Sequence, residues 1–208
     1  MARKNWEAMF DKYVIPNLRP GMKILEIAPE RQLTIKSMID KHLNKNYHYY
    51  YTNLVKEEMD KIVEGKYDKD KRWKKQTDIN PDGWIDCIDD YNYDVVDNSF
   101  DVVFSGNVSE HVREIWTWMK EQHRIIKPGG FVVCHNPFTE PYHEDPIDCW
   151  RIFPEGMKAL IEWAGFKHIG SAHEHLKMDK GSKMKHYETL GLGMKVDDGK
   201  ITKKTSVV

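Results

Sequence analysis

KILEIAPERQLT, Lys23 to Thr34, is the stretch that indicates how this chain folds. Its apolar run, Lys23 to Ala28, predicts a short buried strand, and apolar residues at helical spacings over residues 32–43 predict a helix after it. The turn between the two reads Ala28, Pro29 and Glu30. A strand, a short turn and a helix in this order favour a parallel sheet whose strands are joined by helical crossovers.

Strand and helix patterns alternate along the rest of the chain as well. An opening helix is indicated over residues 6–18, and proline and glycine in Lys127–Gly130 are typical of a helix end that turns directly into a strand. The other expected elements are helices at 108–126 and 154–166, strands at 47–54, 99–106, 131–138 and 187–194, and regular structure at 84–88. The chain is therefore expected to form an α/β fold: a largely parallel sheet, helices on both faces and an antiparallel last strand.

The length fits one domain. A chain of 208 residues can bury one sizeable core and is short for two, so we expect a single domain over residues 1–208. Within it we expect an N-terminal helix in residues 1–20, a charged, exposed insertion at 66–83, and a long polar and aromatic loop at 137–153.

Charge and cysteine content disfavour several classes of protein. The chain has 32 Lys and Arg against 33 Asp and Glu, and this net charge of −1 gives no overall field that attracts nucleic acid or an anionic membrane. No window approaches the roughly 18 apolar residues of a membrane span, and the N-terminus lacks a signal peptide's apolar core. Three cysteines without CxxC spacing favour neither a disulfide framework nor a zinc knuckle. We therefore expect a cytoplasmic protein that does not bind membranes.

Three segments together resemble the class I S-adenosylmethionine-dependent methyltransferases: ILEIAPE from Ile24, IDDYNYDVVDNSFDVVFSGNVSEHV from Ile88, and HRIIKPGGFVV from His123. The middle segment is the most specific, because an acidic residue, a short apolar stretch, SFDVV and an EH pair recur in that order in the family. The resemblance spans roughly Ile24 to Phe166 and points to members that act on small molecules or glycans. It implies a Rossmann-like, mostly parallel seven-stranded sheet flanked by helices, S-adenosylmethionine as cofactor, and methyl transfer as the activity.

The cofactor site is expected beyond the carboxyl ends of the strands, where open α/β sheets bind ligands. The resemblance places Glu26 near the methionine moiety; an ordinary salt bridge or helix-end contact is the alternative for this residue. S-adenosylmethionine carries no pyrophosphate, so the family's glycine turn serves only to let the backbone approach it closely, and Glu30 must point away from the site. The candidate cofactor-binding residues are Glu26, Ala28, Pro29, Glu30, Asn53, Asp89, Asp90, Ser105, Gly106 and Asn107.

Two of these candidates concern the nucleoside part of the cofactor. Asn53 stands where the family commonly has a carboxylate for the ribose hydroxyls, and its amide is the weaker partner, although Glu57 or Glu58 could substitute. Asp89 matches the acid that receives the adenine amino group, with the Asp90 backbone amide beside it. The alternative for Asp89 is a solvated acidic turn.

The segment Asn136–Pro154 is expected to bind the acceptor, because long aromatic loops in such folds are rarely mere connectors; a rigid structural cap is the alternative. Methyl transfer to a hydroxyl needs alignment and a base of near-neutral pKa. His143, held by Asp145 or Asp148, is the first candidate, and His111 is a rival that can equally be structural. The candidate acceptor-binding residues are Tyr142, Asp148, Trp150 and Arg151.

The sequence thus predicts O-methylation of a small-molecule or saccharide acceptor, by a monomer or a homodimer. No metal is expected, because His135, His143, Asp145 and Asp148 fit no named metal-binding spacing. One alternative is a non-catalytic scaffold that keeps the fold without its loop glycines. A weaker one is nucleic-acid binding through the basic run Lys69–Lys75 with Trp73.

Overall fold

The computed structural model describes residues 5–29, 34–52, 83–89, 91–143, 147–176 and 186–197. Along the chain these residues form α1 (Asn5–Tyr13), the 3₁₀ helix η1 (Ile15–Asn17), β1 (Lys23–Ile27), α2 (Thr34–Leu43), β2 (His48–Thr52), β3 (Gly83–Trp84), β4 (Phe100–Gly106), the 3₁₀ helix η2 (Ser109–His111), α4 (Ile115–Ile125), β5 (Ile126–Pro137), α5 (Pro154–Trp163), β6 (Lys167–Leu176) and β7 (His186–Met194). In this part of the chain, no helix combines the length and hydropathy needed to cross a membrane.

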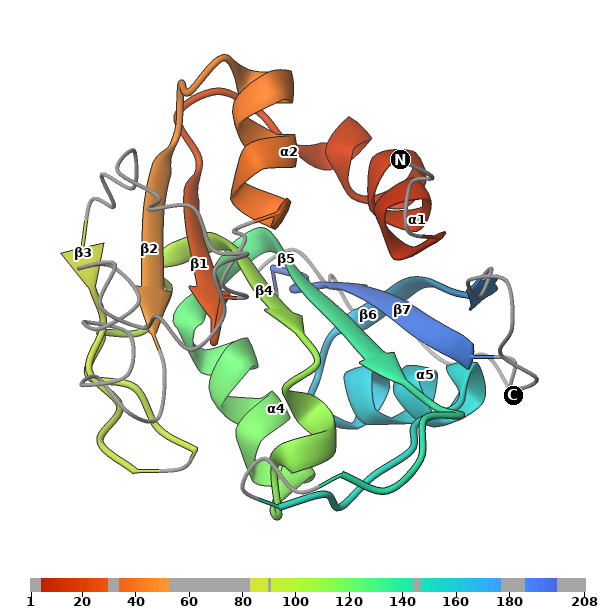
Figure 1. The fold of residues 1–208 in the computed structure, drawn as a ribbon. Coiled ribbons are helices and arrows are strands. Elements are labelled where there is room, and N and C mark those ends of the chain that lie inside the picture. The colour runs from red at the N-terminus through yellow and green to blue at the C-terminus, as the bar shows by residue number, and fades with distance from the viewer. Residues whose placement is uncertain are drawn as a thin grey trace, which may run out of the picture.

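The strands form one seven-stranded sheet in the order β3-β2-β1-β4-β5-β7-β6 (Figure 1). The pairs from β3 to β5 are parallel, whereas β7 runs antiparallel to both β5 and β6. The mostly parallel sheet with an antiparallel last strand is therefore confirmed. Strand order reverses between β1 and β4, which is the place where ligands bind in open α/β sheets.

Alternate residues of the central strands build two hydrophobic layers, because successive side chains of a strand point to opposite faces. On one face, Ile24 of β1 and Phe104 of β4 pack with α1 and α2 through residues such as Phe10 and Ile39. On the other face, Leu25 packs in a cluster that includes the α4 and α5 residues Trp118, Met119, Met157 and Leu160. Helices thus cover both faces, as expected for a parallel sheet (Figure 1).

The expected helix over residues 108–126 is shorter than its apolar spacing suggests. The chain forms η2 first, Val112 is extended (φ −97°, ψ 117°), and α4 begins only at Ile115. The carbonyl of Glu110 accepts the backbone N–H groups of Cys149 and Trp150, and the Val112 carbonyl accepts the Trp150 indole N–H at 2.6 Å. Contacts with a distant loop therefore bind carbonyls that a continuous helix would use for itself.

Two other boundaries also differ from the expectation. The segment Lys127–Gly130 does not separate helix from strand: α4 ends at Ile125 and β5 begins at Ile126, with Gly129 at φ 83°. The strand β6 was not among the expected elements, because its polar sequence shows no clear apolar alternation. It is held instead by pairing with β7 over most of its length.

Candidate functional site

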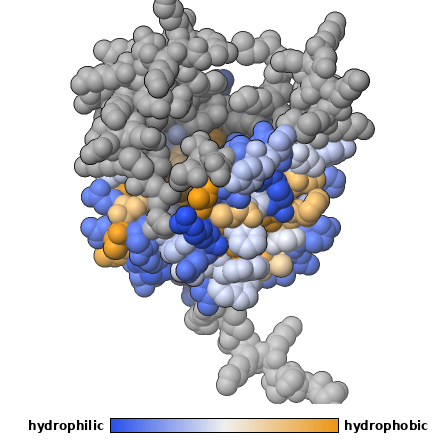
Figure 2. Space-filling view, turned by 60° about the horizontal axis from the view of Figure 1, so that its bottom comes forward, coloured by the Kyte–Doolittle hydropathy of each residue, from blue (hydrophilic) through white to orange (hydrophobic). Residues whose placement is uncertain are grey.

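The carboxyl ends of β1, β2 and β4 lie at the same edge of the sheet (Figure 1). Figure 2 turns this lower side of the molecule toward the viewer, and hydrophobic and hydrophilic residues are mixed over the coloured part of the surface. The residues that follow β1 and β4 therefore lie at the sheet's switch point, where the sequence places the cofactor.

The turn after β1 keeps the backbone shape that glycine usually supplies. Ala28 lies in the left-handed region with φ 46°, and its N–H donates to the Thr52 carbonyl at 2.7 Å. A non-glycine residue in this region costs on the order of 1 kcal/mol. Pro29 follows as a buried residue. The turn has thus lost its glycine and kept the glycine conformation, so the backbone still follows the path that brings it close to a ligand.

Glu26 is the next-to-last residue of β1, and its carboxylate is buried. Its Oε2 accepts a hydrogen bond of 2.6 Å from the hydroxyl of Tyr49 on the neighbouring strand β2. Burial, followed by the charge of Glu26, raises the pKa of the Tyr49 phenol well above its usual value, so Tyr49 remains a donor. The hydrogen bond from Tyr49 fixes the orientation of the Glu26 carboxylate near the end of β1. The sequence did not predict this contact.

Asp89 closes a tight turn after β3. Its carboxylate accepts the backbone N–H groups of Tyr91 and Asn92, each at 2.8 Å, and both carboxylate oxygens accept the Asn92 side-chain amide. These bonds, first among them the one from Tyr91, lower the pKa of Asp89. The contacts of Asp89 are therefore those of an acidic turn, the alternative given for this residue. Its ionised carboxylate is nevertheless exposed, so a ligand can reach it.

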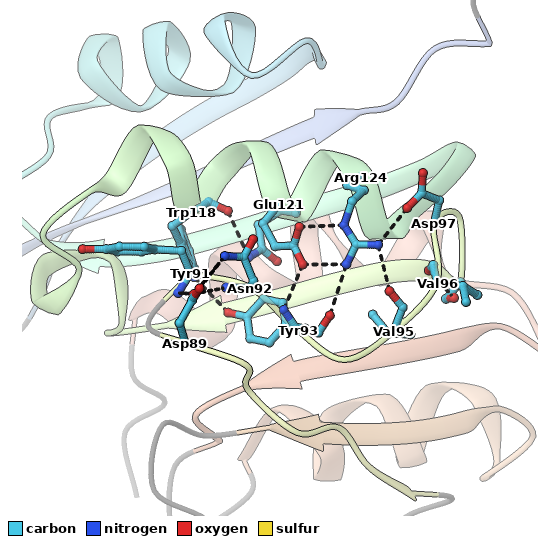
Figure 3. A network of polar contacts seen from close by, with 12 residues as sticks. Asp89, Tyr91, Asn92, Tyr93, Val95, Val96, Asp97, Trp118, Glu121 and Arg124 are labelled. Atoms are coloured by element: carbon cyan, nitrogen blue, oxygen red, sulfur yellow. Dashed lines mark hydrogen bonds and ion pairs between the residues drawn. The ribbon is translucent and has the colours of Figure 1, made fainter.

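A network of polar contacts anchors the Asp89 turn to α4 (Figure 3). Arg124 donates to both oxygens of Glu121 at 2.7 Å, to Asp97 at 2.7 Å, and to the Val95 and Tyr93 carbonyls. The same Glu121 accepts the Tyr93 backbone N–H at 2.9 Å. The hydrogen bonds that Arg124 donates to Glu121 raise the pKa of Arg124, so the cation is permanent. The network thus fixes the loop that carries Asp89.

The three candidates at the end of β4 have different environments. Ser105 is buried, and its hydroxyl lies 3.5 Å from the Cys134 sulfur, so it belongs to the packing between β4 and β5. Gly106 is half-buried, and Asn107 is exposed with φ 54° while its N–H donates to the His135 carbonyl. Gly106 and Asn107 remain accessible at the switch point.

Several predicted site residues lie outside the described residues: Glu30, Asn53, Asp90 and Asp145, together with Glu57, Glu58 and the basic run Lys69–Lys75. Their roles remain predictions. The charged insertion expected at residues 66–83 lies outside the described residues up to residue 82 as well.

Asp148 and Arg151 form the central ion pair of the loop after β5. Both guanidinium Nη atoms donate to Asp148 at 2.6 Å, and Arg151 also donates to the Glu140 and Pro141 carbonyls. Arg151 holds the pKa of Asp148 far below its usual value, and Asp148 in turn raises that of Arg151. Asp148 also accepts the backbone N–H of His143 at 2.8 Å. One buried carboxylate thus ties the two ends of the loop together.

The two candidate histidines face each other. The rings of His111 on η2 and His143 on the loop are perpendicular, with centroids 5.1 Å apart. His111 Nδ1 bonds the Ile147 carbonyl, and His143 Nδ1 lies 3.1 Å from the Pro141 carbonyl and 3.7 Å from Asp148. His111 therefore lies on the short helix η2, outside the expected long helix, and close to His143. The loop after β5 brings these two candidate bases together.

Glu110 is the residue that sequence reasoning missed. It precedes His111 and is fully buried, and its Oε1 lies 3.9 Å from His111 Nε2. Within the described residues neither carboxylate oxygen has a hydrogen-bond partner. Burial raises the pKa of Glu110 to about 8, against the opposing charge of Arg151. The available signal was the EH pair itself, Glu110 beside His111.

A shallow pocket of about 260 Å³ lies beside this cluster, lined by Glu140, Tyr142, Asp148, Cys149, Trp150 and Arg151. All four residues predicted to bind the acceptor are among its walls. Tyr142 is largely exposed, and the Trp150 ring is fixed by its bond to Val112. The pocket therefore combines a held aromatic ring with a guanidinium whose orientation is fixed.

Comparison with known proteins finds similarity to methyltransferases. Residues 38–134 match a family described as a methyltransferase domain. Demethylmenaquinone methyltransferases from two Staphylococcus epidermidis strains are 50% identical over 38 residues, which are 18% of this chain and 16% of theirs. The match to these curated relatives thus spans about a sixth of their length.

Solved structures share the fold at low sequence identity. A SAM-dependent methyltransferase from Aquifex aeolicus superposes with a TM-score of 0.59 at 14% identity, covering 93% of this chain and 90% of that one. One from Methanosarcina mazei gives 0.63 at 14% identity, with 87% and 95% covered. The [4+2]-cyclase SpnF gives 0.63 at 12% identity, with 92% and 80% covered. The fold by itself therefore does not fix the reaction.

Proposed function

We propose that this chain is a class I S-adenosylmethionine-dependent methyltransferase and that it methylates the hydroxyl of a small-molecule or saccharide acceptor; the match to a methyltransferase domain over residues 38–134 and the shared fold support the first part. The observation that carries the proposal is the pairing of His111 and His143 beside the Trp150–Arg151 pocket. Such an arrangement supplies both an acceptor site and a group that can remove a proton.

The residues at the switch point fit the cofactor. The left-handed turn at Ala28 permits close backbone approach, Glu26 is a carboxylate suited to the cofactor's amino group, and Asp89 is an ionised acceptor for an exocyclic amine. When bound, S-adenosylmethionine supplies an electrophilic methyl group on a sulfonium. The chain's task is then to align the acceptor with that group and to take up its proton.

The pocket walls support the proposed acceptor class. Trp150 offers a fixed ring against which the apolar face of a sugar or phenol can pack, and the oriented Arg151 offers donors to an anionic or hydroxyl-rich acceptor. His143 is the proposed base: Asp148 accepts its backbone N–H, and its ring is accessible, with 39% of the side chain exposed. General bases of this kind contribute about 10²–10⁴-fold to rate.

Calorimetric titration of the full chain with S-adenosylhomocysteine tests the cofactor half of the proposal. We expect micromolar binding by the wild type, and a loss of at least about tenfold in Asp89→Ala, because the adenine amine loses a charged acceptor. Glu155→Gln, an exposed acid on α5, is the matched control and should bind like the wild type. No heat up to millimolar ligand would sink the proposal and favour the scaffold alternative.

The substitution Ala28→Gly tests whether the turn limits cofactor binding. We expect S-adenosylhomocysteine to bind a few-fold more tightly, because a methyl group is removed where the backbone approaches the ligand. The free energy of unfolding should change by less than about 1 kcal/mol, since relief of strain in the folded chain is offset by the freer unfolded chain. The same titration and urea unfolding measure both effects; weaker binding in this variant would contradict the role of the turn.

A further inference from the structure

We propose that Glu110, His111 and His143 bind a divalent transition-metal ion of the Zn²⁺ class. One carboxylate oxygen and one ring nitrogen of each histidine all lie within 4.8 Å of one another. Glu110 and His111 come from η2, whereas His143 comes from the loop after β5. The metal-ligand sets considered in the sequence did not include Glu110 or His111, so this combination emerges only from the folded chain.

Both histidines are oriented as metal ligands usually are. The Nδ1 of His111 is engaged by the Ile147 carbonyl, which leaves Nε2 with its lone pair toward Glu110. The Nδ1 of His143 lies 3.1 Å from the Pro141 carbonyl and 3.7 Å from the Asp148 carboxylate, and the Nη2 of Arg151 lies 3.5 Å from it. The shortest of these contacts, the one to the carbonyl, favours a proton on Nδ1, which leaves Nε2 as the ligand. Metal-binding histidines characteristically donate their other ring N–H to a carbonyl or carboxylate in this way.

Glu110 provides a second, independent indication of a ligand. A buried carboxylate whose two oxygens have no hydrogen-bond partner in the described part of the chain is costly, since buried polar groups are normally paired. His111 Nε2 lies 3.9 Å from Glu110 Oε1, beyond hydrogen-bond range. A divalent cation between Glu110 and the two histidines would satisfy this carboxylate.

The donor set indicates the kind of metal. Two imidazoles and one carboxylate match three-ligand zinc sites that keep a fourth position open, whereas Mg²⁺ and Ca²⁺ prefer oxygen ligands throughout. Ligands about 2.0–2.2 Å from Zn²⁺ in tetrahedral geometry lie about 3.4 Å apart, so the ligand atoms, now within 4.8 Å of one another, need to close by up to about 1.4 Å. The His143 side chain is 39% exposed and can make such a movement.

This inference deepens the proposed function, and only its catalytic consequence rests on that function. In the proposed reaction, a bound ion with an open coordination position would promote loss of the acceptor's proton, a task otherwise given to the free imidazole of His143. The binding of the ion can be measured without any methyl transfer. A failure of metal binding and a failure of the methyltransferase proposal can therefore be told apart.

The experiment titrates the chelator-treated full chain with Zn²⁺ in competition with a chromogenic chelator. We expect one Zn²⁺ per chain and a dissociation constant that rises by at least about tenfold in Glu110→Gln and in His143→Ala. His42→Ala removes an exposed histidine on α2 and should bind like the wild type. Added Mg²⁺ at millimolar concentration should not displace the Zn²⁺.

The fold of each variant is checked by its melting temperature without metal, so that a loss of binding is not mistaken for unfolding. A folded Glu110→Gln or His143→Ala that binds Zn²⁺ as tightly as the wild type would overturn the site, as would a wild type without saturable binding. Titration of the same samples with S-adenosylhomocysteine separates the two proposals: loss of Zn²⁺ binding with the cofactor product still bound affects the metal site alone.

Discussion

Arg124→Met is expected to lower the free energy of unfolding by about 3 kcal/mol and to weaken S-adenosylhomocysteine binding. Arg124 is the shared donor to Glu121, to Asp97 and to two backbone carbonyls of the loop that follows Asp89 (Figure 3). Methionine retains the packing of the long stem but leaves the buried Glu121 without its cation, and breaking one side of such a pair costs several kcal/mol. Because the Arg124 side chain is 34% exposed, water offsets part of this loss, and we expect a destabilisation of about 3 kcal/mol and not more.

The matched control is Asp97→Asn. Asp97 bonds the same guanidinium at 2.7 Å but is 67% exposed, so its contribution should stay below about 1 kcal/mol. Urea unfolding measures both variants, and calorimetry measures the cofactor product. If Arg124→Met destabilises the protein while the affinity for S-adenosylhomocysteine is unchanged, the network stabilises the fold and does not position Asp89.

Asp148→Ala should have the second large effect, about 3 kcal/mol on stability together with loss of order in the loop after β5. The carboxylate is 1% exposed and accepts three hydrogen bonds, two from Arg151 and one from the His143 backbone. Alanine leaves the Arg151 cation without its partner and the His143 N–H without its acceptor. Arg151 is 23% exposed, so water offsets part of the loss.

The comparison variant for Asp148→Ala is Glu162→Gln. Lys158 and Glu162 also form an ion pair within α5, but both side chains are more than half exposed and their charged atoms are 3.9 Å apart. The free energy of unfolding should therefore change by close to zero in Glu162→Gln. Zn²⁺ affinity provides the functional measurement, because Asp148 holds the backbone of His143. A folded Asp148→Ala that binds Zn²⁺ with wild-type affinity would show that Asp148 does not position this histidine.

Local patterns in the sequence were sufficient for most of the sheet and its helices. The strands β1, β2, β4 and β7 and the helix α5 follow from apolar periods and from Pro154 and Gly165 at the ends of that helix. These signals are reliable because a parallel strand buried on both faces must be apolar throughout. The polar strand β6 lacked this signal, since its place depends on pairing with β7.

For the candidate cofactor residues, the sequence predicted their places along the chain better than the contacts that they make. The family resemblance located Glu26 and Ala28 at the end of a strand, which is where they lie, whereas Asp89 lies in a turn five residues beyond the end of β3. It did not reveal that Tyr49 holds Glu26, that Ala28 adopts the glycine conformation, or that Arg124 anchors the Asp89 loop. Those contacts join residues that are distant in sequence.

By itself, then, the sequence determined the order of the helices and of all strands except β6, the edge of the sheet at which a ligand is expected and the polar loop, because these follow from local periodicity and chain topology. Only the tertiary structure decided how that loop acts. Its residues 147–150 form hydrogen bonds with the backbone carbonyls of Glu110 and Val112 and with the His111 side chain. These bonds interrupt the expected helix and bring Glu110, His111 and His143 together. Such a cluster depends on long-range hydrogen bonds, for which the sequence carries no periodic signal.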